Sequence, residues 1–140
     1  MTVKPLNFGP VIHATFLERP NRFLVRCRLE NGRTVEAFMP NPGRMGELLL
    51  PGVRLHLVDN GKGTLRKTRF TCLAVDREGA SVFLHTHVNN AVAEYLLRAG
   101  RIPGLERAEV VRSEVRVGHS RFDFLLREGG RDVLAEVMSV

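Results

Sequence analysis

The sequence predicts an α+β protein in which a small OB-like β-barrel precedes one helix and three antiparallel strands. Over residues 10–85, short apolar runs alternate with turn residues about every 8–12 positions. Over residues 88–99 the apolar positions instead recur at helical spacing. A chain of 140 residues holds one ordinary domain or two very small ones. We therefore expect a barrel over residues 1–85 and a second, partial α/β domain over residues 86–140.

Six short apolar segments separated by turn residues make up the expected barrel: residues 11–17, 22–30, 33–39, 53–58, 69–75 and 81–85. The segment 22–30 alternates with period two, which places Phe23 and Val25 on its apolar side, toward the core. Asn31-Gly32 after it is a strong hairpin signal. Five or six such strands fit a five-stranded OB-like barrel, whose face often binds oligonucleotides. A tiny β-sandwich is the alternative.

The second half of the chain changes period. Residues 88–99 predict one amphipathic helix, with Thr86 or Asn89 as the residue that caps its start. Three strand-like segments then follow, over residues 108–117, 120–128 and 131–138.

Positive charge is concentrated in the first 85 residues. These hold 13 basic and 7 acidic residues, whereas residues 86–140 hold 8 of each, so the net charge of +6 belongs to the predicted barrel. Only three of the 21 cations are lysines, and the planar fork of arginine suits phosphate oxygens. This balance favours DNA as the partner, and a solubilising surface is the alternative. The cations expected to contact DNA are Arg22, Arg26, Arg28, Arg44, Arg66, Lys67 and Arg69.

Two further observations limit the class of protein. No apolar run approaches the ~20 residues that a membrane span needs, and the first residues carry no signal-peptide pattern. We therefore expect no membrane partner and a cytoplasmic location. Cys27 and Cys72 each fall in an apolar segment, which favours buried free thiols over a disulfide.

Hairpin register brings three carboxylates into one row. A two-residue loop at 129–130 places Asp123 opposite Glu136, and a similar loop at 118–119 places Glu114 opposite Asp123. Like charges directly opposite each other destabilise a sheet. A bound divalent cation such as Mg²⁺ would offset that repulsion. Ion pairs with nearby arginines, or carboxylates that extend into water, are the alternatives.

The spacing of Asp123 and Glu136 resembles the PD-(D/E)xK nuclease motif. The resemblance implies that both acids bind Mg²⁺ and that, with Glu114 assisting, they activate a water for attack on phosphate. The motif's lysine, two residues after the second acid, is Met138 here. A thioether is neither a base nor a charge-assisted donor. A magnesium-dependent nuclease, impaired by Met138, is therefore the alternative function.

Four stretches together resemble the sugar fermentation stimulation protein family, SfsA: RFLVRCRLENG (22–32), PNPGRMGELLLPG (40–52), LHTHVNNAVAEYLLRAGRIPGL (84–105) and SEVRVGHSRFDFLL…AEVMSV (113–140). The resemblance implies an OB-like domain followed by a nuclease-like domain, DNA binding, and a link to regulation of sugar utilisation. It also implies that Glu94 on the helix is a further metal-site acid; an i,i+4 pair with Arg98 is the alternative.

Members of the family continue past the point where this sequence stops, so we expect a truncated protein. Truncation would leave the final sheet with an open edge, and an open edge favours pairing with a second copy of the chain. The first hypothesis is therefore a DNA-binding protein of the SfsA family, the second is an impaired nuclease, and the third is a non-enzymatic fragment that forms a homo-oligomer.

Overall fold

The computed structural model describes residues 7–63 and 67–138, which form two compact units. The N-terminal unit covers residues 7–86, and the C-terminal unit covers the described residues from 87 onward. Within the described residues, no helix is long and apolar enough to cross a membrane.

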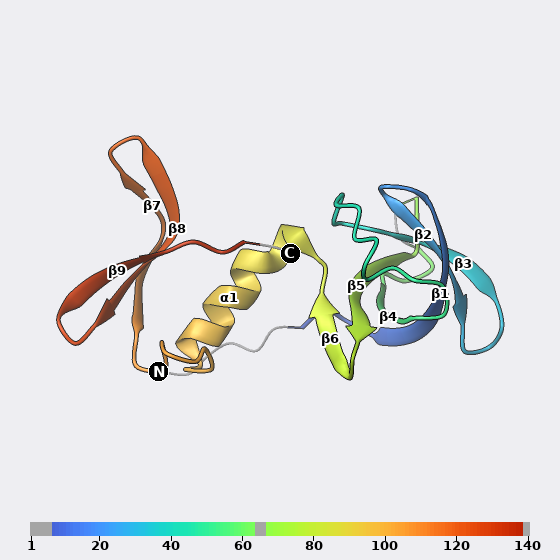
Figure 1. The fold of residues 1–140 in the computed structure, drawn as a ribbon, viewed down its shortest axis with the longest axis horizontal. Helices are drawn as coiled ribbons and strands as arrows, with labels where there is room; N and C mark the ends of the chain where they lie inside the picture. The colour runs from blue at the N-terminus through green and yellow to red at the C-terminus, as the bar shows by residue number, and fades with distance from the viewer. Residues whose placement is uncertain (1–6, 64–66, 139–140) are drawn as a thin grey trace. The chain divides into compact units, whose positions relative to one another are not determined.

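The N-terminal unit is a closed barrel with one added strand (Figure 1). Its strands are β1 (Val11–Asn21), β2 (Leu24–Leu29), β3 (Thr34–Phe38), β4 (Arg54–Asp59), β5 (Phe70–Arg77) and β6 (Ala80–Phe83). Antiparallel pairs run in the order β3-β2-β1-β4-β5-β6, and a parallel pair between β3 and β5 closes the first five strands into a ring. The predicted OB-like barrel is therefore confirmed.

The barrel core follows from the alternation that the sequence shows. Val25 and Cys27 on β2 are fully buried, as are Leu55 and Leu57 on β4. Both cysteines of the chain are buried free thiols, as predicted. Burial raises the pKa of Cys27 to about 11 and that of Cys72 to about 12, so both thiols stay protonated and unreactive at neutral pH.

The prediction that Phe23 belongs to the core is wrong. β1 does not stop near Leu17 but continues to Asn21, and register shifts opposite β2 accommodate Pro20 at its end. The turn therefore falls on residues 22–23, where the Asn21 side chain accepts a hydrogen bond of 2.8 Å from the Phe23 amide. As a turn residue Phe23 leaves the alternation, and 54% of it is exposed.

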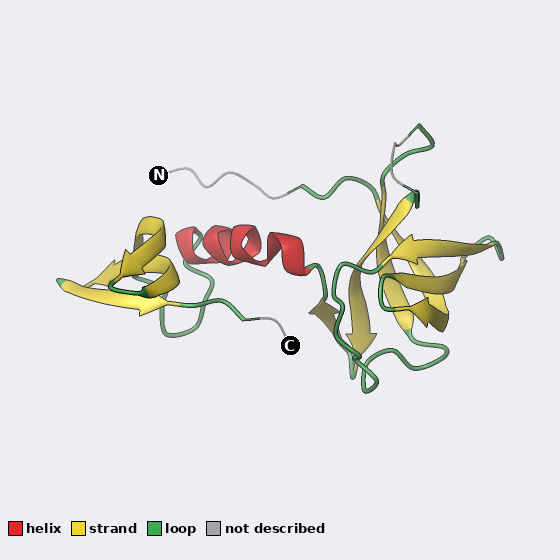
Figure 2. Cartoon of the chain, turned by 90° about the horizontal axis from the view of Figure 1, so that it is seen from above, coloured by secondary structure: helices red, strands yellow, loops and turns green. Residues whose placement is uncertain are grey.

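The C-terminal unit packs one helix against one face of a three-stranded sheet (Figure 2). Its elements are α1 (Asn89–Arg98), β7 (Glu109–Val117), β8 (Ser120–Glu128) and β9 (Arg131–Ala135), and a short 3₁₀ turn (Thr86–Val88) precedes the helix. Leu97 of the helix joins Phe124 and Leu126 of β8 in the core. The capping prediction is wrong, because Val88 is the N-cap residue and Thr86 donates its hydroxyl hydrogen bond to the Pro40 carbonyl instead.

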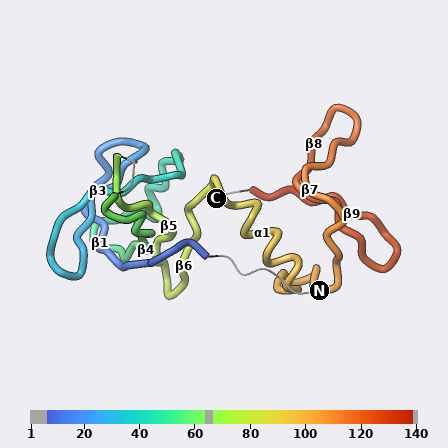
Figure 3. The backbone as a smooth tube through the Cα atoms, turned by 180° about the vertical axis from the view of Figure 1, so that it is seen from behind, coloured from blue at the N-terminus to red at the C-terminus, as the bar shows by residue number. Residues whose placement is uncertain are grey.

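Both predicted hairpin registers of the three-stranded sheet are confirmed next to their turns, whereas the predicted pairs of Asp123 with Glu114 and with Glu136 are not among the strand pairs of the sheet. Glu128 pairs with Arg131 across the tight turn at 129–130, where both glycines have positive φ. Figure 3 traces this connection and the one after β7 as separate loops. The strand order is β7-β8-β9, so β7 and β9 are the edges of the sheet as described. Pairing of such an edge with a second chain stays a prediction.

Candidate functional site

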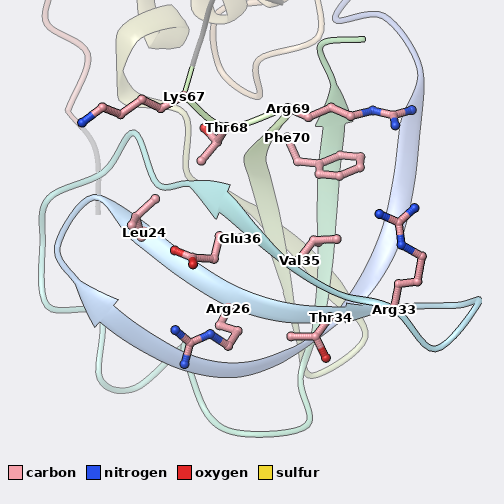
Figure 4. Close-up of a pocket in the computed structure, with 10 residues that line it drawn as sticks. All are labelled: Leu24, Arg26, Arg33, Thr34, Val35, Glu36, Lys67, Thr68, Arg69 and Phe70. Atoms are coloured by element: carbon pink, nitrogen blue, oxygen red, sulfur yellow. The ribbon is translucent and has the colours of Figure 1, made fainter. Parts of the chain in front are cut away.

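A basic groove lies on the outer face of the barrel (Figure 4). It has a volume of about 600 Å³, and its walls come from β2, β3, the end of the β4–β5 segment and the start of β5. The ten residues of the basic groove are Leu24, Arg26, Arg33, Thr34, Val35, Glu36, Lys67, Thr68, Arg69 and Phe70. Three of the cations predicted to contact DNA therefore lie on one concave surface.

Two of the groove arginines already have carboxylate partners. Arg26 pairs with Glu18 of β1. Arg69 donates two hydrogen bonds of 2.8 Å, one to each carboxylate oxygen of Asp59. These bonds and the Gly61 amide lower the pKa of Asp59 to about 2, and the Asp59 carboxylate in turn raises the pKa of Arg69. Because each of these two arginines is paired with a carboxylate, Arg26 and Arg69 form part of the groove wall but add little net positive charge to it.

Arg33 and Lys67 are the exposed cations of the groove. Sequence reasoning included Lys67 but missed Arg33. Arg33 follows the β2–β3 turn, where its amide donates a hydrogen bond of 2.9 Å to the Asn31 side chain. The signal was present in the sequence, because the residue after an Asn-Gly turn begins the return strand and lies beside the strand that carries the other arginines.

Arg19 brings together two further predicted cations. Its guanidinium donates hydrogen bonds of 2.5 and 2.9 Å to the carbonyls of Gly43 and Arg44, and of 2.8 and 2.9 Å to those of Arg22 and Asn41. One side chain therefore ties the turn after β1 to the loop at 40–45. Both Arg22 and Arg44 are exposed. The predicted phosphate contact at Arg44 thus rests on a loop whose backbone is fixed.

The other two predicted cations lie elsewhere. Arg28 is exposed on β2, opposite Thr34 of β3, but it does not line the basic groove. Arg66 lies outside the described residues.

A polar cluster on the barrel does not have the geometry of a catalytic triad. The Asp76 carboxylate lies 2.6 Å from Nε2 of His56, and the Ser81 hydroxyl lies 3.3 Å from the same nitrogen. Ser81 also donates a hydrogen bond of 2.8 Å directly to Asp76. The hydrogen bond with His56 is the main cause that lowers the pKa of Asp76, and the hydrogen bond from Ser81 lowers it further. Because both partners contact one nitrogen, His56 cannot relay a proton between them.

An acidic pocket lies in the C-terminal unit. It has a volume of about 170 Å³ and is lined by residues of α1, β7 and β8. Three carboxylates are among them, Glu94, Glu114 and Asp123. Two of these were predicted site residues, and the third was the additional acid that the resemblance implied.

The predicted row of three carboxylates is not continuous. Glu114 has φ of +54°, which interrupts regular pairing with β8, and its carboxylate lies 3.3 Å from the Arg121 guanidinium. The Glu94 carboxylate lies 3.6 Å from the Arg98 guanidinium, which is the i,i+4 pair predicted as the alternative to a metal ligand. Among the described residues, no group of three or more His, Cys, Asp or Glu side chains is close enough to hold a metal ion. Arginine pairs therefore offset part of the repulsion between the acids.

Asp123 is the most firmly held of the predicted acids. One of its carboxylate oxygens accepts a hydrogen bond of 2.8 Å from the Asn90 amide group of α1, and the other accepts one of 2.6 Å from the Val137 backbone amide. Glu136 follows the end of β9 and is exposed, and it does not line the acidic pocket. Met138 is 84% exposed. The catalytic and metal-binding roles of Asp123, Glu136 and Glu114 stay predictions.

Comparison with known proteins matches both units. The model of the SfsA N-terminal OB domain matches residues 17–84, and that of the sugar fermentation stimulation protein RE domain matches residues 87–140. A sugar fermentation stimulation protein homolog of Chloroflexus aurantiacus is 40% identical over 97% of this chain and 52% of its own. One from Moorella thermoacetica is 37% identical over 93% of this chain and 56% of its own.

A solved structure is also similar. The structure of Pyrococcus furiosus SfsA in complex with Ca²⁺ is 27% identical, with a TM-score of 0.65 over 97% of this chain and 56% of that one. The chain thus spans about half the length of the curated relatives it matches. Since the two family models match consecutive segments that cover most of the sequence, the chain belongs to the sugar fermentation stimulation protein family, SfsA.

Proposed function

We propose that this chain binds DNA through the basic groove of its N-terminal barrel. The observation that carries the proposal is that cations from β2, from the β2–β3 turn and from the segment before β5 line one concave surface. Barrels of this type bind oligonucleotides on the face of their second and third strands and on the adjoining loops. Arg33 and Lys67 would contact phosphates, and the paired Arg26 and Arg69 would form the walls.

The names of the matched relatives refer to stimulation of sugar fermentation. We accordingly place the proposed DNA binding in the regulation of sugar-utilisation genes. The name belongs to relatives of which this chain spans about half, and the regulatory role is part of the proposal.

Fluorescence anisotropy of labelled DNA tests the proposal. We expect a signal whose association constant falls steeply between about 50 and about 200 mM salt, because each neutralised phosphate releases counterions. The double variant Arg33→Ala/Lys67→Ala should lower the affinity about tenfold and reduce the salt slope by about 1 for each lost contact. Arg107→Ala, an exposed arginine of the C-terminal unit, is the matched control.

Two results would contradict the proposal. One is an absence of binding to both single-stranded and duplex DNA at low salt. The other is binding that the double variant leaves unchanged while the Arg107→Ala control weakens it.

A divalent-cation site in the acidic pocket is a second candidate, and the specific observation for it is the donor set. Glu94, Glu114 and Asp123 line one pocket and offer only oxygen atoms, which hard cations such as Ca²⁺ and Mg²⁺ prefer. The similar Pyrococcus furiosus structure is a complex with Ca²⁺. The oxygen donors are therefore of the chemical type that Ca²⁺ and Mg²⁺ bind, and binding would bring the three carboxylates closer together.

Each residue of the pocket would have a defined part. The bonds from Asn90 and Val137 orient the Asp123 carboxylate, so this group would be the fixed ligand. Glu114 and Glu94 would leave their arginine partners to complete the set. A bound cation would supply Lewis-acid polarisation of phosphate or water. With Met138 in place of a lysine, a magnesium-dependent nuclease of the PD-(D/E)xK type would be impaired at the step that activates water.

Calorimetric titration with Ca²⁺ and with Mg²⁺ tests the site. Asp123→Asn should abolish binding, whereas Asp132→Asn, which changes an exposed acid paired with Arg127, should leave it unchanged. Equal binding by both variants would contradict the assignment. For the nuclease, Met138→Lys should create magnesium-dependent cleavage of labelled DNA. If neither the parent chain nor this variant cleaves DNA or binds the cations, the acids are structural.

A further inference from the structure

We propose that the basic groove takes an unpaired nucleic-acid strand, with bases inside the groove and phosphates at its rim. This inference rests on the proposed DNA binding and adds to it the form of the ligand and the group that contacts the bases.

Three apolar side chains are among the residues that line the groove. Leu24 of β2 and Val35 of β3 are partly exposed there, and Phe70 closes it from β5 with 7% of its surface accessible. Apolar side chains on a concave surface offer contact to the faces of bases, but they offer nothing to a phosphate. A ligand that covers these three side chains gains most from weakly hydrated groups such as base faces.

An acid lies inside the groove among the cations. Glu36 is exposed on β3, directly across the strand pair from Arg26, whose guanidinium pairs with Glu18. Figure 4 shows Glu36 beside Leu24 and above Arg26, and Val35 between Glu36 and Arg33. A carboxylate here repels phosphates, but it accepts hydrogen bonds from base N–H groups. We therefore expect phosphates to lie at the two exposed cations, Arg33 and Lys67, and base edges to lie at Glu36.

The size of the groove also favours a single strand. A volume of about 600 Å³ lies in the range of pockets that enclose small organic groups. A duplex keeps its base faces inside the stack, and its grooves accept a protruding helix or β-ribbon rather than fill a hollow. An unpaired strand exposes both the faces and the Watson–Crick edges of its bases.

An exposed aromatic ring next to the groove offers a surface on which a base can stack. Phe23 precedes the groove residue Leu24 and is 54% exposed, and the Arg22 guanidinium lies 5.9 Å from the centre of its ring. An exposed ring with an adjacent cation is the combination on which single-strand binders stack bases. Arg19 fixes the carbonyl of Arg22, which holds this turn in place.

The experiment compares three labelled ligands by anisotropy: a 12-nucleotide oligo-dT, the same strand with two central guanines, and a 12-base-pair duplex. We expect each single strand to bind about tenfold more tightly than the duplex. The guanine strand should bind more tightly than oligo-dT, because N1 and N2 of unpaired guanine offer two adjacent donors to the Glu36 carboxylate. Glu36→Gln should remove most of this preference, a loss of about fivefold or more.

Glu78→Gln, which changes an exposed acid of the β5–β6 turn outside the groove, is the matched control and should keep the preference. Phe23→Ala should weaken both single strands and spare the duplex.

The outcomes separate the inference from the proposed function. Duplex binding as tight as single-strand binding would overturn the inference and leave DNA binding intact. An equal gain in affinity for both single strands on Glu36→Gln would also overturn it, because phosphates would then face the carboxylate. Binding of none of the three ligands would overturn the proposed function, and the inference with it.

Discussion

The two units use charge in contrasting ways. On the barrel, Glu18 and Asp59 pair with two arginines of the basic groove, and the other two cations of the groove, Arg33 and Lys67, are exposed. In the C-terminal unit three acids line a pocket, and two of them pair with arginines that do not line it. Residues 1–85 carry the whole excess of +6, whereas residues 86–140 are neutral.

This difference shows why net charge alone does not locate a site. The C-terminal half is neutral in sum, yet three of its acids line one pocket. The barrel is basic in sum, yet half of the cations in its groove are already paired. The sign of the uncompensated groups in each hollow decides which ligand the hollow attracts.

The largest expected effect comes from breaking the C-terminal core. Phe124 is 1% exposed and packs with Leu97 and Leu126. Phe124→Ala should lower the free energy of unfolding of this unit by about 3–5 kcal/mol, measured by urea denaturation through the helical circular dichroism signal. DNA affinity should persist, because the proposed groove belongs to the barrel. Loss of DNA binding in a chain whose barrel remains folded would contradict that assignment.

A smaller effect is expected inside the barrel at Arg19. Lysine cannot reproduce the planar fork that reaches four carbonyls, so Arg19→Lys should cost about 1–3 kcal/mol. Urea denaturation measures the loss, and Arg54→Lys at an exposed position of β4 should change stability by less than about 0.5 kcal/mol. Equal losses in the two variants would show that the fork geometry is unimportant.

The pH dependence of the barrel sharpens the contrast further. The pKa of Asp59 falls from 3.8 to about 2 on folding. Its pairing with Arg69 therefore stabilises the barrel fully above pH 3.8, and this contribution disappears as the pH falls through about 2. Asp59→Asn should lose stability at neutral pH and be less sensitive to acid across this window. Parallel pH profiles of melting temperature for the two proteins would refute the assignment.

The smallest effect is expected at the edge of the acidic pocket. The pair between Arg121 and Glu114 is about two-thirds exposed on both sides. Arg121→Ala should therefore change stability by less than about 0.5 kcal/mol. It should nevertheless raise Ca²⁺ affinity in calorimetry, since Glu114 loses a competing cation. An unchanged or weaker affinity would indicate that Glu114 takes no part in cation binding.

Local signals were enough to predict much of the fold. The alternation of Val25 and Cys27 specified a buried strand, and helical spacing over 88–99 specified α1. The two glycines at 129–130 specified the last hairpin and its register. Each of these signals acts between residues close in sequence, so a single chain suffices to read it.

Local signals failed where a distant contact decided the outcome. Phe23 lies in a turn and not in the core, because β1 extends to Asn21 along β2 and the turn begins later than the sequence pattern predicted. Thr86 does not cap the helix, because its hydroxyl donates a hydrogen bond to the Pro40 carbonyl instead. Glu114 lines the acidic pocket with Asp123, but its left-handed backbone angle interrupts the regular strand pairing and its carboxylate pairs with Arg121.

The sequence by itself therefore determined the two architectures, the family and the excess of positive charge in the first half, because composition and short-range periodicity encode them. Only the tertiary structure decided which charges remain free. Closure of β3 against β5 brought residues 33–36 beside residues 67–70 and so formed the groove. Ion pairs such as Arg69 with Asp59 formed only once those strands were adjacent, because a charge interaction depends on distance in space rather than along the chain.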